Sequence, residues 1–175
     1  MTVPTNAFDY LLWIQDEAAA HAVGMPKSDQ VEATWQAVLF RAGGQQMLVP
    51  LIQVRAILPP PHQVRIPGAK SWIAGLANMR GELTGIYDLA RFYFQLPAEQ
   101  TRHSVVLLAK NSRFSVAFLV DRSYGIRQVP FSAERPIQDV HLTGVLREAW
   151  VENEWLPILN LDALTESDQF MNAVA

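Results

Sequence analysis

The stretch GLANMRGELTGIYDL, residues 75–89, decides the fold of this chain. It consists of two short apolar runs joined by a polar turn. Gly81 lies in that turn, and glycine adopts positive φ angles at little cost, as a tight connection between strands requires. Arg80 and Glu82 flank the glycine and are expected to face solvent. The stretch therefore predicts a β-hairpin with a charged tip.

Short apolar segments separated by turn residues continue on both sides of this hairpin. Gly43 and Gly44 form a two-residue hairpin signal, and the prolines at 59–61 end the strand that follows, because proline cannot donate a hydrogen bond to a ladder. The pattern predicts strands or extended pieces over residues 34–41, 46–58, 62–66, 104–109, 113–121, 124–129, 142–150 and 154–161. It also predicts a helical turn over 68–73, a central hairpin that extends to about residue 93, and a short helix over 164–170.

The two halves of this pattern form a weak internal repeat. The corresponding segments are 38–54 with 105–121, 74–76 with 143–145, and 84–89 with 156–161. One half alone, at roughly 60 residues, would bury too little apolar surface to be stable. Two barrels packed together would share a core, and closure would remove exposed strand edges. We therefore predict an all-β fold of two five-stranded β-barrel subdomains that share an apolar core, with an added N-terminal α-helix and a short C-terminal helix.

The N-terminal residues differ from the rest of the chain. Apolar residues recur near helical spacing behind Asn6, a favourable N-cap, and Gly24 and Pro26 form a stop signal. This predicts an amphipathic helix over residues 7–22. The expected organisation is an N-terminal helical extension and linker at 1–33, the barrel domain at 34–165, and a C-terminal tail with a short helix at 166–175.

Composition argues against several classes of function. The chain has 175 residues, of which 50% are hydrophobic and 18% charged, with a net charge of −3 and no cysteine. A nucleic-acid partner is not expected, because no basic stripe is present. Disulfides and zinc–thiolate sites are excluded. No secretory signal and no apolar run of about 20 residues is present, so we expect a cytoplasmic protein without direct membrane insertion.

No motif indicates catalysis or a cofactor. The four histidines, His21, His62, His103 and His141, lack the spacing of a local metal pair. Asp88 and Asp121 each end an apolar strand, and we expect them to accept backbone N–H groups in the following turn rather than to form a catalytic pair. We therefore expect a protein that is not an enzyme and that holds no cofactor and no metal.

Two tryptophans, Trp150 and Trp155, bracket the turn of the last hairpin. They are interpreted as a cross-strand aromatic pair, and the alternative is an exposed anchor for a partner protein.

The central hairpin carries a pattern of specific residues. Asn78, Arg80, Gly81, Asp88 and Leu89, the lead-in P-G-x-x-x-W-I-x-G at 67–75, and T-G-V followed by L-P-I-L-N-L within 143–161 together resemble the signature of the CheW-like adaptor domain. The resemblance covers about residues 34 to 165. It implies the two-barrel architecture described above and a scaffold without catalysis that joins receptors to a kinase.

The resemblance also implies a binding site and partners. Arg80 matches a receptor-contact arginine, and Gly75 matches a glycine that lets a partner helix approach the backbone. Val54 matches an apolar residue of the groove between the two barrels in which the receptor would bind. Asn78 and Gly81 complete this expected receptor-binding site. The implied partners are the cytoplasmic tip of a methyl-accepting chemoreceptor and the regulatory domain of a CheA-like histidine kinase. The implied location is the cytoplasm, at membrane-bound chemoreceptor arrays.

Some positions depart from the family pattern. The groove strand carries Arg55 and Ala56 where a carboxylate is frequent at the second of these positions, and Gly85 stands where proline is frequent. The long N-terminal segment and the wording W-I-x-G-x-A-N-x-R-G resemble the PilI type, which serves type IV pilus twitching systems. The alternatives left open by the residues are a β-barrel that binds a small molecule and one that binds nucleic acid.

Overall fold

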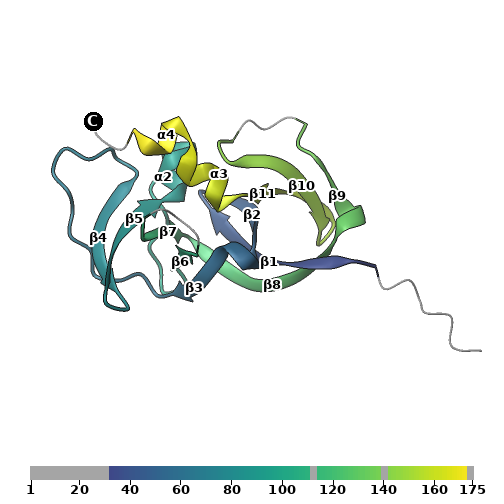
Figure 1. Cartoon of the computed structure of the whole chain (residues 1–175), viewed down its shortest axis with the longest axis horizontal. Coiled ribbons are helices and arrows are strands. Elements are labelled where there is room, and N and C mark those ends of the chain that lie inside the picture. The colour runs from purple at the N-terminus through teal and green to yellow at the C-terminus, as the bar shows by residue number, and fades with distance from the viewer. Residues whose placement is uncertain (1–31, 111–113, 139–141, 173–175) are drawn as a thin grey trace, which may run out of the picture. The chain divides into compact units, whose positions relative to one another are not determined.

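A computed structural model of the protein describes residues 32–110, 114–138 and 142–172. The chain divides into two units, Met1–Glu32 and Ala33–Ala175. The helix expected over residues 7–22 lies outside the described residues. The second unit is built almost entirely from strands, with short helical segments after them (Figure 1).

Eleven strands of the described residues form two sheets. The first, sheet A, has the order β8-β1-β2-β11-β10-β9, and the second, sheet B, has the order β3-β6-β7-β5-β4. The strands of sheet A are β1 (Thr34–Ala42), β2 (Gln45–Pro50), β8 (Arg122–Pro130), β9 (Glu134–Pro136), β10 (Val145–Val151) and β11 (Glu154–Leu159). Those of sheet B are β3 (Val54–Leu58), β4 (Ile73–Met79), β5 (Glu82–Asp88), β6 (Val105–Ala109) and β7 (Val116–Val120). The helices are α2 (Leu89–Phe94), α3 (Leu161–Glu166) and α4 (Asp168–Met171), with 3₁₀ turns η1 (Leu51–Gln53) and η2 (Phe131–Ala133).

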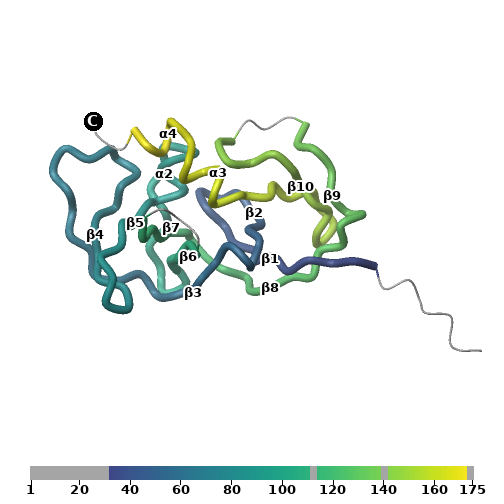
Figure 2. The backbone as a smooth tube through the Cα atoms, in the orientation of Figure 1, coloured from purple at the N-terminus to yellow at the C-terminus, as the bar shows by residue number. Residues whose placement is uncertain are grey.

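The internal repeat is present, but each half completes the sheet of the other. The hairpin β1–β2 from the first half pairs in parallel with β11 from the second, through β2. The hairpin β6–β7 from the second half pairs in parallel with β5 from the first, through β7. The chain passes from sheet A to sheet B at β3, which pairs with β6. It returns to sheet A at β8, which pairs with β1 (Figure 2). Neither half therefore has a complete sheet of its own.

Both sheets curl until side chains from distant strands meet. In sheet A, Trp35 of β1 donates its indole N–H to Glu134 of β9 at 2.5 Å, although three strands separate them in the sheet order. In sheet B, Arg55 of β3 pairs with Glu82 of β5 at 2.8 Å across two intervening strands. The expected two-subdomain all-β fold is confirmed. The sheets are curled rather than hydrogen-bonded into full circles within the described residues, and sheet A has six strands rather than five.

The shared core follows from the alternation of side chains along β1. Val38 and Phe40 point into the large cluster that both sheets share, whereas Ala37 and Leu39 point into a smaller cluster inside sheet A. All four are fully buried. A strand buried on both faces reads as a continuous apolar run, which is also true of β6 and β7. The two subdomains are thus held together by a core cluster to which both sheets contribute.

Two local predictions were wrong for identifiable reasons. The strand expected over 46–58 is interrupted by η1, because the chain leaves sheet A there and enters sheet B. The helical turn expected over 68–73 is replaced by turns, since Gly68 has φ +74° and a right-handed helix does not accommodate that angle. The extended piece expected over 62–66 retains one bridge, Val64 to Leu76.

The end of the central hairpin and the course of the C-terminal helix also differ from the prediction. The central hairpin ends at Asp88 rather than near residue 93, because the Asp88 carboxylate accepts the N–H of Arg91 at 2.9 Å and so caps helix α2. The helix expected over 164–170 is divided into α3 and α4, and Ser167 caps the second of these.

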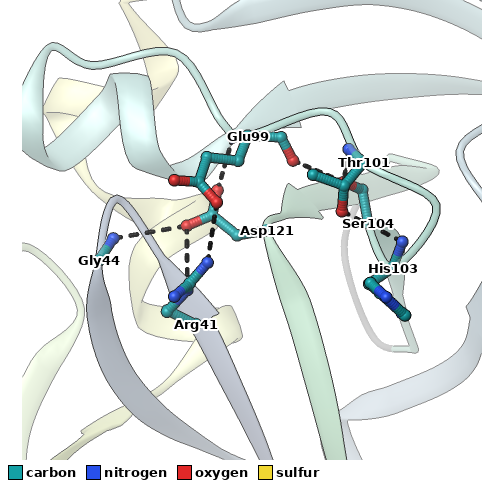
Figure 3. Close-up of polar contacts among 7 residues, drawn as sticks. All are labelled: Arg41, Gly44, Glu99, Thr101, His103, Ser104 and Asp121. Atoms are coloured by element: carbon teal, nitrogen blue, oxygen red, sulfur yellow. Dashed lines mark hydrogen bonds and ion pairs between the residues drawn. The ribbon is translucent and has the colours of Figure 1, made fainter.

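Asp88 has the role predicted for it, whereas Asp121 accepts backbone N–H groups from distant parts of the chain rather than from the turn that follows it. Besides capping α2, Asp88 accepts the N–H of Ala98 at 3.0 Å. Asp121 accepts the N–H of Glu99 at 2.8 Å and lies 3.8 Å from the Arg41 Nε (Figure 3). Two buried carboxylates therefore fix the connection between the halves of the repeat at adjacent residues.

Candidate protein-binding site

The tip of the β4–β5 hairpin is a two-residue turn. Arg80 and Gly81 have φ angles of 53° and 86°. Positive φ at both central residues is typical of a type I′ turn, whose twist suits two antiparallel strands. The Asn78 side-chain oxygen accepts the Gly81 N–H at 3.0 Å. Asn78 and Gly81 therefore fix the turn on which the Arg80 side chain is presented.

Arg80 is exposed, and its guanidinium makes no hydrogen bond and no ion pair within the part of the chain that the structure describes. A guanidinium offers five N–H donors in a planar fork, suited to a carboxylate or to backbone carbonyls. The arginines of sheet A, in contrast, are engaged, for example Arg127 with Glu152 at 2.7 Å. The hairpin tip thus holds a cation whose donors are available to another molecule.

Val54 lies near this tip, because the residue that follows it forms an ion pair with the hairpin. The residue is buried at the start of β3 and packs into the shared core. The adjacent Arg55 reaches Glu82, the first residue after the turn, at 2.8 Å. The structure therefore brings the beginning of β3 and the tip of the hairpin together, as the sequence-based site requires. Val54 itself presents little of its side chain to solvent.

Gly75 lies further along β4, opposite Ile86. Its φ is 149°, and a Cβ at this position would overlap the backbone carbonyl of Val64. The cause of the close approach is the bridge between Val64 and Leu76, whose two N–H···O bonds are each 2.8 Å long. The glycine is therefore required by a contact within the chain. Access of a partner helix at Gly75 stays a prediction.

An apolar residue close to Arg80 in the hairpin was not singled out for the site from the sequence. Leu83 is 69% exposed on β5. The signal for Leu83 was present, because it alternates with the buried Thr84 and Ile86 in a way that places it outward. The tip therefore combines a cation with apolar surface, a composition typical of protein interfaces.

A second surface, also not identified from the sequence, is a groove on sheet A. It has a volume of about 600 Å³ and is lined by Thr34, Trp35, Gln36, Pro50, Leu51, Ile52, Phe131, Glu134, Arg147 and Ile158. η1 and η2 flank it and expose Ile52 and Phe131, at 72% and 57%. Trp35 and Ile158 pack against the smaller core cluster, so the groove is where the interior of the curled sheet reaches the surface.

The polar residues of this groove bond mainly to one another. Glu134 accepts the Trp35 indole N–H and also pairs with Arg147 at 2.7 Å. The sequence signal for the groove would have been a proline followed by large apolar residues, at Pro50-Leu51-Ile52 and Pro130-Phe131. A strand that ends in this way leaves apolar side chains without a sheet to cover them.

The last hairpin, β10–β11, presents an aromatic pair. Trp150 and Trp155 are cross-strand partners with ring centroids 5.5 Å apart, which confirms the pair interpretation. The Arg135 guanidinium lies 3.7 Å from the Trp155 ring centroid and pairs with Glu148. The Arg135 contact holds the pair in place. Trp150 is nevertheless exposed and remains in contact with solvent.

Burial raises the pKa of two tyrosines that pack against the core, Tyr93 and Tyr87. The Tyr93 hydroxyl donates to the carbonyl of Thr143 at 2.6 Å. Within the described ranges, no group of three histidine, aspartate or glutamate side chains is placed to hold a metal ion. None of the described helices has the length and apolar character needed to cross a membrane.

Comparison with known proteins gives consistent matches. The family model of the CheW-like domain matches residues 36–169. The protein PilI of Pseudomonas aeruginosa is 27% identical over 169 residues, which cover 94% of each chain. The chemotaxis protein CheW of Bacillus subtilis is 26% identical over 145 residues, covering 78% of this chain and 90% of that one. Among solved structures, the scaffolding protein TtCheW from Thermoanaerobacter tengcongensis superimposes with a TM-score of 0.70 at 16% identity, over 78% of this chain and 96% of that one.

Proposed function

The chain belongs to the CheW-like domain family, and from this premise we propose that it is a non-catalytic adaptor. It couples a methyl-accepting chemoreceptor to a CheA-like histidine kinase, in a chemosensory pathway that controls type IV pilus twitching motility. The observation that carries the proposal is the unpaired, exposed Arg80 on a rigid hairpin tip. The pilus assignment is supported by the similarity to PilI over nearly the whole of both chains.

The receptor surface is the tip of the β4–β5 hairpin. A receptor tip is a helical bundle, and its helix ends and acidic side chains supply acceptors for the Arg80 donors. Leu83, on the strand that follows the turn, adds apolar contact area beside the cation. Asn78 and Gly81 hold the turn, so the guanidinium is presented with little conformational freedom to lose on binding.

A scaffold needs a second surface that leaves the first one free. The groove on sheet A meets this need, because its lining residues belong to sheet A, η1 and η2, whereas the Arg80 tip belongs to sheet B. We assign the groove to the regulatory domain of the kinase, as a contact between the ends of two barrels. The receptor state would then alter kinase activity through the geometry in which the adaptor holds both partners. Such an adaptor works in the cytoplasm, at receptor arrays.

A second candidate function, the binding of a small molecule, rests on the size of the same groove. Its volume of about 600 Å³ lies in the range of ligand sites. The two charged side chains of the lining, Glu134 and Arg147, form an ion pair with each other. The groove therefore offers few free donors or acceptors to a ligand. A ligand-dependent rise in melting temperature would support this alternative.

Titration calorimetry tests the adaptor proposal. The full-length protein is titrated with the regulatory domain of the CheA-like kinase and with a receptor-tip fragment from the same organism. We expect saturable binding of both, and a loss of receptor affinity of about tenfold or more in Arg80→Ala. The matched control is Arg102→Ala, an exposed arginine outside both surfaces. Absence of binding to both partners would overturn the proposal.

A further inference from the structure

Charged residues are rare on sheet B. In the described strands β3 to β7, the charged side chains are Arg55, Glu82 and Asp88. Asp88 is buried and bonded to the N–H groups of Arg91 and Ala98. The exposed charges of the sheet are therefore Arg55 and Glu82, and they pair with each other at 2.8 Å.

The position of this pair is not explained by stability. The side chains of Arg55 and Glu82 are 44% and 51% exposed. Ion pairs with this exposure contribute little to folding, because solvent screens them and both long side chains must be ordered. β3 is already held by its own ladder with β6. The pair does, however, lie directly beside the unpaired Arg80.

Glu82 is the carboxylate best placed to neutralise Arg80. The two residues flank Gly81 in the same turn, and both are exposed. A guanidinium and a carboxylate at the end of one hairpin would be expected to form an ion pair. They do not, because the Glu82 carboxylate is turned to two other partners through its Oε2, Arg55 at 2.8 Å and the Ser115 hydroxyl at 3.5 Å. These partners come from β3 and from the residue before β7, and they draw Glu82 towards the sheet.

We propose that Arg55 is a positioning residue that keeps Arg80 available to a partner by holding Glu82 in an ion pair. The tip then carries two cations and one anion, and the free cation is the one on the turn. The partner group that fits is a carboxylate, and in the proposed function it belongs to the receptor tip. The inference rests on that function only for the identity of the partner.

The test is a cycle of variants at positions 55 and 82, titrated with the receptor-tip fragment at low salt. Arg55→Ala should weaken binding about three- to fivefold, the range set by the strength of an exposed ion pair. Arg55→Lys, which retains a cation that can hold Glu82, should bind close to the wild type. Glu82→Gln removes the competing carboxylate, so the double variant Arg55→Ala with Glu82→Gln should recover the affinity of Glu82→Gln alone.

Two results would overturn the inference. If the double variant binds as weakly as Arg55→Ala, then Arg55 contacts the partner itself. If Arg55→Ala binds like the wild type, Glu82 does not compete for Arg80.

A second measurement needs no receptor and separates this inference from the proposed function. The NMR signal of the Arg80 Nε–H group should move in Arg55→Ala, as Glu82 turns to Arg80, and should return in the double variant. An unmoved signal would also overturn the inference. Failure of the wild type to bind the receptor fragment would overturn the proposed function, while the NMR result still decides the role of Arg55.

Discussion

The hairpins β4–β5 and β10–β11 occupy equivalent positions in sheets B and A, and their tips are used differently. Both turns have two residues with positive φ, Arg80 and Gly81 in the first and Glu152 and Asn153 in the second. In the second hairpin the charged turn residue, Glu152, is paired with Arg127. In the first, Arg80 is unpaired. The backbone geometry is the same, and the surrounding side chains decide whether a tip stabilises the fold or remains available.

The difference originates in the strands beside each hairpin. β10 has β9 as a neighbour, and this strand supplies Arg135, which stacks on Trp155 and pairs with Glu148. Within the described residues, the outer side of β4 has a bridge from Leu76 to Val64 in place of a paired strand. The first hairpin therefore has fewer internal partners for its exposed side chains.

The largest expected effect concerns the glycines that enter the two hairpins. Gly75→Ala should cost about 3 to 4 kcal/mol, because the new Cβ meets the Val64 backbone in a region of φ unfavourable to alanine. Gly144→Ala should cost about 2 to 3 kcal/mol, because the added Cβ would lie 2.9 Å from the Leu164 side chain. Urea unfolding measures both. A smaller loss for Gly75→Ala than for Gly144→Ala would contradict the tight crossing at Val64.

The residues that end the two hairpins come next. Asp88→Ala should cost about 2 to 3 kcal/mol, because the N–H groups of Arg91 and Ala98 both lose their acceptor. Asn160→Ala removes the corresponding cap of α3, where Ala163 is the backbone donor, and should cost about 1 to 2 kcal/mol. Thermal unfolding of both variants checks the order. Equal losses would mean that the contact of Asp88 with Ala98 adds nothing to the cap.

A third pair of variants separates stabilising from available surface. Trp155→Ala should cost about 2 kcal/mol, because it removes the stacking of Arg135 and Trp150, and should leave binding of the receptor fragment unchanged. Leu83→Ala should change stability by less than about 0.5 kcal/mol and should weaken that binding. Chemical unfolding and calorimetry on the same preparations give both readings. A large loss of stability for Leu83→Ala would remove the distinction between the hairpins.

The smallest effect concerns a hydroxyl that joins the two regions. Tyr93 of α2, behind the first hairpin, donates to Thr143 at the entry to the second, and burial raises its pKa. Above a pH of 10.0, the ordinary pKa of tyrosine, the unfolded chain loses this proton while the folded chain keeps it. Stability is therefore fully present below that pH and falls above it, by up to about 1.4 kcal/mol per pH unit. Urea unfolding at increasing pH should show a shallower fall in Tyr93→Phe. An unchanged slope would show that the phenol does not titrate differently in the two states.

The sequence predicted most of what is local. The hairpin at 75–89 was predicted because alternation and a glycine turn are properties of adjacent residues. The acceptor role of Asp88 and the pairing of Trp150 with Trp155 were likewise predicted from position within short segments. Helix α2 was missed because its cap, Asp88, had been read as the end of a strand, which it also is.

The candidate site was only partly accessible from the sequence. Arg80, Asn78 and Gly81 were found through the turn they form, and their role in binding stays a prediction. The groove on sheet A was missed, because its lining comes from residues 34–36, 50–52, 131, 134, 147 and 158, which no local pattern joins. The break of the strand at η1 was missed for the same reason, since nothing in 46–58 indicates which sheet accepts its second part.

By itself, the sequence determined where strands alternate, where turns with positive φ fall, and that a cation lies on the central turn. The tertiary structure alone decided that each half completes the sheet of the other, that Gly75 is required by Val64, and that Glu82 pairs with Arg55, 27 residues away, rather than with its neighbour Arg80. Turn chemistry and side-chain alternation act over a few residues of chain. Parallel pairing and ion pairing between strands depend on which distant segments the shared core brings together.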